Sequence, residues 1–176
     1  MKIINLYGGP GTGKSTVAAE LFVLCKKAGY NVELIPEYAK SMVYEKRFNI
    51  LDDDQLYILA KQHRSIYRLL DQPMDYVVVD SPIVNSAAYN QHKNLNQDIL
   101  NLLVRELNNK YDNTNIFLTR NPEYGYNPNG RIQATPEEAD IKSNEIRKQL
   151  DYFNIEYTVM MNDNDIASTI YELVCK

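Results

Sequence analysis

The stretch Gly8-Gly9-Pro10-Gly11-Thr12-Gly13-Lys14-Ser15 decides the fold predicted for this chain of 176 residues. It matches the pattern Gly-x-x-x-x-Gly-Lys-Ser/Thr at every defined position. The mostly apolar run Lys2–Tyr7 before it predicts a buried strand, and Lys14–Ala28 after it predicts a helix closed by Gly29. A strand, a glycine-rich turn and a helix therefore follow one another, which is the context that this pattern requires.

The chemistry of this turn suits the binding of phosphate groups. Glycine permits backbone angles that other residues avoid, so the amide N–H groups of the turn can point inward at an anion. The following helix N-terminus attracts the β-phosphate, Lys14 can reach the β- and γ-phosphates, and Ser15 offers a hydroxyl to Mg²⁺. The sequence therefore predicts that ATP and Mg²⁺ bind here. The residues expected to contact the nucleotide are Gly8, Gly9, Pro10, Gly11, Thr12, Gly13, Lys14, Ser15 and Thr16.

Short apolar runs alternate with helical periods along the rest of the chain. Further strands are expected at Asn31–Ile35, Tyr76–Asp80, Ile116–Thr119 and Glu156–Met160. Helices are expected at Glu37–Arg47, Asp52–Leu70, Pro82–Asn90, Gln97–Tyr111, Pro136–Phe153 and Asp165–Cys175. Five strands separated by helices predict an α/β fold, with a parallel sheet covered on both faces in one domain over residues 1–176. Ligands bind such sheets beyond the carboxyl ends of the strands.

Two of the expected helices carry start signals. Thr135 is placed to cap one helix, with Pro136 at its first position and Glu138 completing a capping box. Asp52 is placed to cap another, with Gln55 three residues on. The apolar side of this second helix is expected to comprise Leu56, Leu59, His63, Ile66 and Leu70. On that side a histidine is most simply a core residue with a hydrogen-bond partner, and the alternative is that His63-Arg64 faces an acceptor site.

The strand Tyr76–Asp80 is continuous, β-branched and ends in a carboxylate. An apolar run followed by Asp has the form of a Walker B motif, whose Asp orients the Mg²⁺ shell, often through water. We therefore expect Ser15 and Asp80 to hold the metal. The alternative is that this Asp, or Ser81 after it, caps the next helix.

A second carboxylate, Glu37, stands just past the second strand. Removing the proton from an acceptor hydroxyl needs a base within hydrogen-bond reach, and Glu37 is a candidate for that role. The alternative is a first-turn Glu that the helix dipole favours. Lys40 and Arg47 lie on the same expected helix and either meet a substrate phosphate or are solvated surface charges.

The segment of about residues 120–135 is rich in Asn, Pro, Gly and Tyr and carries Arg120 and Arg131 near its ends. Phosphoryl transfer is catalysed mainly by positive charge around the transferring group, and a closing loop also excludes water. We therefore expect a lid, with Arg131 preferred over Arg120 as the arginine that reaches the phosphates. The alternative is a tyrosine-rich surface turn. Tyr89 and Tyr126 are the tyrosines best placed to stack on a base.

Composition disfavours several classes of protein. The net charge is −4 with a pI of about 5.2, and the basic residues are scattered, so a long nucleic acid is a less expected partner. No apolar stretch has the length of a membrane span and no signal peptide is visible, which favours a cytoplasmic protein. Cys25 and Cys175 form no metal-ligand pattern and are expected to be reduced and structural, and His92 is expected to be exposed.

With these motifs the chain resembles the P-loop nucleoside and nucleotide kinases, and more narrowly the small AAA kinase-like proteins of phages that are related to nicotinamide riboside kinase domains. The resemblance rests on Gly8–Ser15, Pro36–Ala39, Asp80–Pro82 and Arg120–Arg131 with the helix after it. It implies a three-layer P-loop NTPase sandwich with strand order 2-3-1-4-5 and a lid between strands four and five.

The resemblance also implies ATP as phosphoryl donor with Mg²⁺, and a catalytic set of Lys14, Glu37, Asp80, Arg120 and Arg131. In nucleoside kinases a carboxylate placed like Glu37 is the base or holds the sugar hydroxyls. Many P-loop kinases contact adenine after strand five, where Asn162-Asp163 stands here. The chain departs from the deoxynucleoside kinase pattern, because Ser81 rather than Arg follows Asp80.

Three hypotheses of function follow. The leading one is a kinase that phosphorylates a small nucleoside or (deoxy)nucleoside monophosphate and that, like many such kinases, can be a homodimer. The second is a kinase acting on hydroxyls of DNA or RNA, at a strand end or a modified base. The third is a non-catalytic nucleotide-dependent switch. Asn109-Lys110-Tyr111-Asp112 matches the letters of a guanine-binding motif, but it precedes a strand instead of following one, so we attribute the match to chance.

Overall fold

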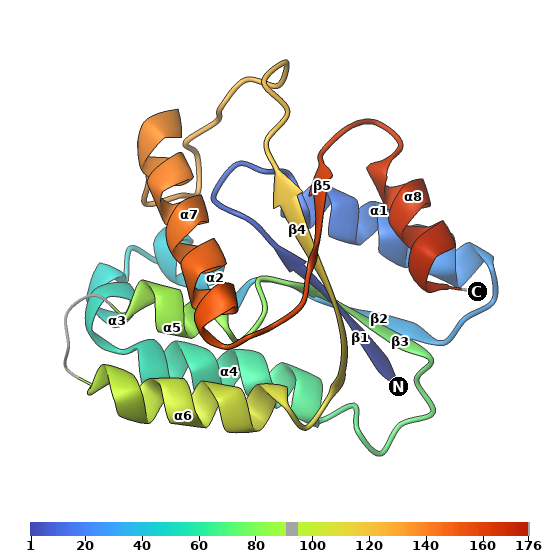
Figure 1. Ribbon diagram of the computed structural model, residues 1–176, viewed down its shortest axis with the longest axis horizontal. Coiled ribbons are helices and arrows are strands. Elements are labelled where there is room, and N and C mark those ends of the chain that lie inside the picture. The colour runs from blue at the N-terminus through green and yellow to red at the C-terminus, as the bar shows by residue number, and fades with distance from the viewer. Residues whose placement is uncertain (91–94, 176) are drawn as a thin grey trace.

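The computed structural model describes residues 1–90 and 95–175, and His92 lies outside them. Five parallel strands form one sheet in the order β2-β3-β1-β4-β5 (Figure 1). The strands are β1 (Lys2–Tyr7), β2 (Val32–Ile35), β3 (Tyr76–Asp80), β4 (Asp112–Thr119) and β5 (Thr158–Met161). This confirms the α/β fold and the strand order expected from the sequence.

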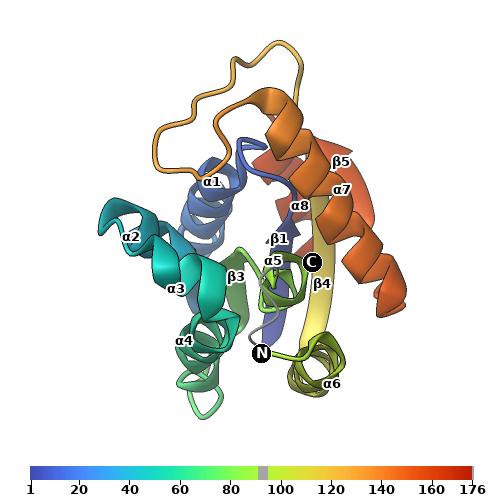
Figure 2. The same ribbon diagram turned by 90° about the vertical axis from the view of Figure 1, so that its left-hand side faces the viewer.

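Helices cover both faces of the sheet and make it the middle of three layers (Figures 1 and 2). One face carries α1 (Lys14–Lys27) and α8 (Ile166–Val174). The other carries α4 (Gln55–Tyr67), α5 (Asn85–Tyr89), α6 (Gln97–Asn108) and α7 (Pro136–Tyr152). Two short helices, α2 (Tyr38–Tyr44) and α3 (Phe48–Asp53), lie beyond the end of β2. Within residues 1–90 and 95–175, none of the helices has the length and apolar character that crossing a membrane requires.

The alternation of side chains along β1 explains the two halves of the core. Ile3 and Tyr7 point into the half covered by α4 to α7, and Ile4 and Leu6 point into the half covered by α1 and α8. All four are at most 1% exposed, as expected for a central strand buried on both faces.

The register of the strands brings their carboxyl ends to one edge of the sheet. Leu6 of β1 pairs with Asp80 of β3, and Ile35 of β2 pairs with Val79. The P-loop after β1, Ser81 after β3 and Glu37 after β2 therefore begin side by side.

The helix expected over Asp52–Leu70 is wrong in its first turn. Two helices, α3 and α4, occupy this region, and Asp54 interrupts the helical conformation between them. The Asp54 side chain caps α4 by accepting a hydrogen bond from the Tyr57 amide at 3.0 Å. Gln55 does not complete a capping box, because its Nε2 donates to the Leu51 carbonyl at 2.6 Å. The break also shifts the buried side of the helix, which comprises Gln55, Ile58, Leu59, Gln62 and Ile66. Leu56 and Leu70 are instead 44% and 43% exposed.

Strand four is longer than its apolar run Ile116–Thr119 predicted, because it begins at Asp112. Its polar first half is partly exposed but has a buried partner: Asn5 of β1, which is 3% exposed, donates to Asn113 at 2.9 Å and to Asn115 at 3.0 Å. A buried side-chain amide can therefore extend a strand that the hydrophobic pattern ends too early.

Other boundaries need smaller corrections. The helices expected over Glu37–Arg47, Pro82–Asn90 and Gln97–Tyr111 are shorter, and strand five begins at Thr158 instead of Glu156. The start of α7 agrees with its signal, since Thr135 Oγ1 accepts from the Glu138 amide at 3.2 Å. The Glu138 carboxylate bonds the Ala134 amide at 2.7 Å, one residue before the partner that a capping box predicts.

Cys25 on α1 and Cys175 after α8 are free, buried thiols with their sulfurs 3.6 Å apart. Burial raises the pKa of Cys25 to about 12, which leaves little thiolate at neutral pH. We expect both thiols to react with a disulfide reagent at least about 100-fold more slowly in the native protein than in denaturant, where two equivalents should be released. Rapid release of either equivalent under native conditions would contradict this packing.

Candidate active site

The P-loop adopts a conformation that its glycines make possible. Gly13, immediately before α1, has φ of +85°, and a Cβ atom there would lie 2.1 Å from the side chain of Asn162. Gly9 packs on α7 and donates its amide to Ser143 Oγ at 3.3 Å, while buried Thr12 returns its hydroxyl to the Gly9 carbonyl at 3.0 Å. The loop is therefore held in place by contacts with Asn162 after β5 and with Ser143 of α7, as well as by its own strand and helix.

Lys14 and Ser15 place a cation and a hydroxyl at the start of α1. The Lys14 ammonium donates to the carbonyls of Gly8 and Gly9, both at 2.9 Å. Burial lowers the pKa of Lys14, and the nearby carboxylates of Asp80 and Glu37 oppose that shift. Phosphate oxygens are stronger acceptors than these two carbonyls, so the ammonium can exchange one set of partners for the other.

Asp80 is 4% exposed, and its Oδ2 accepts from Ser15 Oγ at 2.5 Å. Its other carboxylate oxygen is buried without a hydrogen-bond partner among the residues the structure describes. The residue does not cap the next helix, because α5 begins only at Asn85 and its N-cap residue is Val84. A hydroxyl beside an unpartnered carboxylate oxygen fits Mg²⁺, which binds through one or two protein oxygens together with water and phosphate. The donor set thus fits the metal predicted for Ser15 and Asp80.

Glu37 follows β2 and lies half-buried beside the P-loop. Burial raises the pKa of its carboxyl group and the Asp80 carboxylate raises it further, against the lowering effect of Lys14, Lys40 and Arg131. Its side chain does not cap α2, although it is the N-cap residue. The carboxylate therefore has no structural hydrogen bond to the helix it precedes, unlike a first-turn Glu placed there only to satisfy the backbone.

Gln62 of α4, which the sequence analysis missed, holds the segment around Glu37. It is 4% exposed; its Oε1 accepts from the Tyr38 amide at 3.1 Å, and its Nε2 donates to the carbonyls of Pro36 at 3.3 Å and Asp80 at 3.4 Å. One amide thus ties the ends of β2 and β3 to the start of α2. The available signal was a glutamine in helical phase with Leu59 and Ile66, which the wrong phase of the predicted helix concealed.

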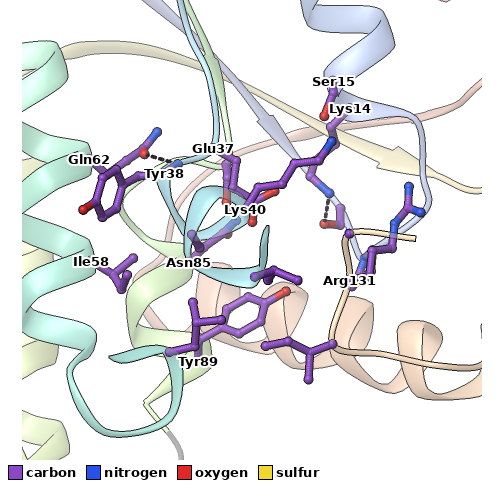
Figure 3. Close-up of a pocket in the computed structure, with 18 of the residues that line it drawn as sticks. Lys14, Ser15, Glu37, Tyr38, Lys40, Ile58, Gln62, Asn85, Tyr89 and Arg131 are labelled. Carbon is purple, nitrogen blue, oxygen red and sulfur yellow. Dashed lines mark hydrogen bonds between the residues drawn. The ribbon is translucent and has the colours of Figure 1, made fainter. Parts of the chain in front are cut away.

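These groups face one cavity of about 240 Å³, shown in Figure 3 with Lys14, Glu37, Lys40 and Arg131 around it. The P-loop forms one wall. The opposite wall comes from α2, α3, α4 and α5 and comprises Tyr38, Val43, Leu51, Gln55, Ile58, Asn85 and Tyr89. The cavity therefore joins the P-loop, where the sequence predicts phosphate binding, to a mostly apolar compartment with a few polar groups, which is typical of small-ligand sites.

The segment of residues 120–135 reaches from β4 over the P-loop to α2. A Cβ at Gly11 of the P-loop would lie 2.7 Å from the ring of Tyr126, and a Cβ at Gly130 would lie 2.7 Å from the hydroxyl of Tyr44. Figure 2 shows the segment arching beyond the carboxyl ends of the strands. With Arg131, Ile132 and Gln133 it lines the cavity. This placement is that of a closed lid.

The two lid arginines differ in their surroundings, although both stack on Tyr126, with guanidinium-to-ring distances of 5.1 Å for Arg120 and 5.6 Å for Arg131. Arg120 is bound to Asp140 of α7 at 2.7 Å and does not line the cavity. Arg131 lines the cavity and donates to backbone carbonyls of the lid, those of Asn127 and Asn129. The geometry brings Arg131, and not Arg120, together with the P-loop lysine.

The remaining candidates divide clearly. Lys40 lines the cavity, whereas Arg47 is exposed and pairs with Glu45. His63 bonds the Tyr111 hydroxyl at 2.7 Å, outside the cavity, as expected for a histidine with a structural partner. Tyr89 lines the cavity, with the ammonium of Lys142 from α7 4.6 Å from its ring centre.

We expect Arg131→Ala to lower kcat for phosphoryl transfer by about 100-fold or more, because one positive charge on the transferring group has that effect in related chemistry. Arg120→Ala should have a smaller effect on kcat and a larger one on thermal stability, since it breaks the tie to α7. Steady-state kinetics and melting curves of both variants, with exposed Arg105→Ala on α6 as the control, test this order. A larger loss of kcat in Arg120→Ala would reverse the assignment.

The comparisons with known proteins bear on the family and the fold. The family model described as an AAA domain matches residues 3–167, so the chain belongs to that family. The fold is similar to the crystal structure of NadR protein in complex with NR, with a TM-score of 0.71, 20% identity and 99% of this chain covered. The chain spans only 52% of that NadR chain.

A second similar structure is thymidylate kinase from Ehrlichia chaffeensis, with a TM-score of 0.66, 16% identity and coverage of 99% of this chain and 98% of that one. No curated protein sequence matches this chain significantly. At these identities the structural likeness establishes the fold, which is the three-layer P-loop NTPase sandwich that the sequence predicted.

Proposed function

We propose that this protein is an ATP- and Mg²⁺-dependent kinase that transfers the γ-phosphoryl group to a small nucleoside or nucleoside monophosphate. The observation that carries the proposal is that one cavity is lined by the P-loop Lys14, the carboxylate of Glu37 and the lid arginine Arg131. A phosphate site alone would serve any nucleotide-binding protein. A half-buried carboxylate beside it, in a cavity that the lid also lines, serves transfer to a second substrate.

Each side chain has a role in this reaction. The P-loop amides and Lys14 hold the β- and γ-phosphates, and Arg131 adds positive charge as the bond from the γ-phosphorus to its bridging oxygen breaks. Ser15 and Asp80 are the residues that would hold Mg²⁺, which neutralises phosphate charge when bound. Glu37 accepts the proton of the attacking hydroxyl, whose oxygen forms the new bond to phosphorus. The lid excludes water, a competing acceptor.

The apolar side of the cavity supports a mononucleotide-sized acceptor. Val43, Leu51 and Ile58 offer a surface for a flat base, and Asn85 and Tyr89 add polar atoms. We propose a small molecule as partner in preference to a long nucleic acid, in keeping with the net charge of −4. The names of the two similar structures, one with NR bound and one a thymidylate kinase, suggest which acceptors to try first.

The test is transfer from labelled ATP with Mg²⁺ to a panel of nucleosides, nucleoside monophosphates and short DNA, with Lys14→Ala as the inactive control. Transfer to one mononucleotide class is the expected result. Transfer to DNA alone would overturn the proposal and favour a kinase that acts on hydroxyls of DNA or RNA. ATP binding with transfer only to water would overturn both and favour a nucleotide-dependent switch.

A further inference from the structure

Asn85 in the wall of the cavity has a polar atom without a partner. It is the first residue of α5, is 6% exposed and lines the cavity (Figure 3). Its Nδ2 donates to Ser81 Oγ at 3.0 Å. Its Oδ1 is buried and has no hydrogen-bond partner within residues 1–90 and 95–175. Burying an amide oxygen without a hydrogen-bond donor costs free energy, and a bound ligand that donates to this oxygen would remove that cost.

The amide of Gln62 on the same wall is already committed to the fold. Both side-chain atoms of Gln62 bond the backbone of Pro36, Tyr38 and Asp80. The Nε2 of Gln55 donates to the carbonyl of Leu51. Asn85 differs from Gln62, because its Nδ2 is hydrogen-bonded within the fold while its Oδ1 has no partner in the described part of the chain.

The positive φ of Ser81 shows how this arrangement is held. Ser81 has φ of +67°, which is uncommon for a residue other than glycine, asparagine or aspartate. The bond from Asn85 Nδ2 to its hydroxyl spans the turn between β3 and α5 and holds the Asn85 side chain in place, with Oδ1 as the atom left without a partner among the described residues. Backbone strain next to a fixed polar side chain occurs where orientation matters for binding.

We propose that Asn85 determines specificity: its Oδ1 accepts a hydrogen bond from an uncharged N–H or O–H group of the phosphoryl acceptor. This inference rests on the proposed function and narrows its substrate class. An acceptor that presents a donor to this oxygen supplies the hydrogen bond that the described residues leave unmade. With the amide in this orientation, a compound that presents a carbonyl or ring nitrogen brings two lone pairs together and is disfavoured.

Two parts of a nucleoside can supply this donor, namely an N–H of the base or a hydroxyl of the sugar, and matched substrate pairs distinguish them. For the base, the pairs are adenosine with purine riboside, cytidine with pyrimidin-2-one riboside, thymidine with 3-methylthymidine, and nicotinamide riboside with nicotinic acid riboside. For the sugar, adenosine is compared with its 2′-deoxy and 3′-deoxy forms. Each compound is supplied as the nucleoside and as the 5′-monophosphate.

The measured quantity is the ratio of kcat/KM within each pair, for the wild type, Asn85→Leu, Asn85→Asp and a control. The control is Asn101→Leu on α6, which makes the same change at a residue 8% exposed and outside the cavity. In at least one pair we expect the wild type to prefer the donor-bearing compound by about 100-fold or more. Asn85→Leu should reduce that preference to within about threefold, whereas Asn85→Asp, which keeps an acceptor oxygen, and Asn101→Leu should preserve it.

An unchanged preference in Asn85→Leu, or no preference in the wild type for any pair, overturns the inference while leaving the kinase intact. Melting curves identify a variant that fails to fold, and Asn85→Ala then replaces Asn85→Leu as the variant without an acceptor. If no compound is phosphorylated, the proposed function fails, and the same pairs are compared by calorimetric binding with the same expected ratios. Absence of binding by every compound overturns both.

Discussion

Lys14→Ala is expected to lower kcat/KM for phosphoryl transfer by about 1,000-fold or more. Lys14 is the positive charge that the fold carries into the P-loop, and its ammonium lies 2.9 Å from the carbonyl oxygens of Gly8 and Gly9, where we propose that a phosphate binds. Mutations that remove one preorganised charge or donor from a transferring group cost about 100-fold to 100,000-fold, depending on the site. The measurement is steady-state transfer from labelled ATP to the acceptor found with the panel.

The control for this substitution is Lys27→Ala at the exposed end of the same helix, which should leave kcat/KM within about twofold of the wild type. Lys14→Arg should not restore activity, because a planar guanidinium does not fit where a point charge is cradled by backbone. If Lys14→Ala transfers phosphate as fast as the wild type, the P-loop is not the catalytic phosphate site and the proposed function fails.

The fold and one wall of the site were predictable because their signals are local in sequence. The P-loop is eight consecutive residues, and its strand and helix flank it directly. The β-branched run of β3 ends at Asp80, and the parallel register then places that carboxylate beside Ser15, 65 positions away. Rules for parallel sheets convert such local signals into one shared edge, which is why the phosphate side of the cavity followed from sequence.

The wall of the cavity formed by α2, α3, α4 and α5 could not be predicted from the sequence, because it depends on which side each helix turns toward the cavity. The break at Asp54 turns the buried side of α4 by one residue, which brings Gln62 under Glu37 and removes His63 from consideration. No pattern in the sequence marks that break other than a run of three aspartates, any of which can cap. Asn85 was missed because its role depends on one unpartnered oxygen, a property of packing that residue type does not reveal.

The choice between the lid arginines shows the same limit. Both flank a loop of Asn, Pro, Gly and Tyr, and both stack on Tyr126. What separates them is Asp140, on the helix after the loop, which binds Arg120 and holds it away from the cavity. A contact between residues 20 positions apart across a loop is decided by the path of the loop, and periodicity carries no information about that path.

Glu37→Gln is expected to lower kcat by about 100-fold or more when the acceptor is a hydroxyl, because general base catalysis contributes that much. The substitution keeps the size of the half-buried side chain and removes its negative charge together with its ability to take a proton. The matched control is Glu45→Gln at the other end of α2, an exposed residue paired with Arg47, which should leave kcat within about twofold. Melting curves establish that both variants are folded.

The pH dependence gives an independent signature of the same group. The base must be ionised to act, and burial together with Asp80 raises the pKa of Glu37, so kcat/KM should rise with pH through a value above that of an ordinary glutamate. Burial lowers the pKa of Lys14, whose charged form is required, so kcat/KM should fall again at alkaline pH. In Glu37→Gln the rising limb should disappear and the falling limb should persist.

This experiment also distinguishes the two acceptor classes that the proposed function leaves open. A sugar hydroxyl must lose its proton as its oxygen attacks phosphorus, whereas the oxygens of a monophosphate are already ionised at neutral pH. With a nucleoside as acceptor, Glu37→Gln should therefore abolish most of kcat. If kcat stays within about tenfold and KM rises instead, Glu37 binds the acceptor and does not activate it, and a nucleoside monophosphate becomes the favoured acceptor.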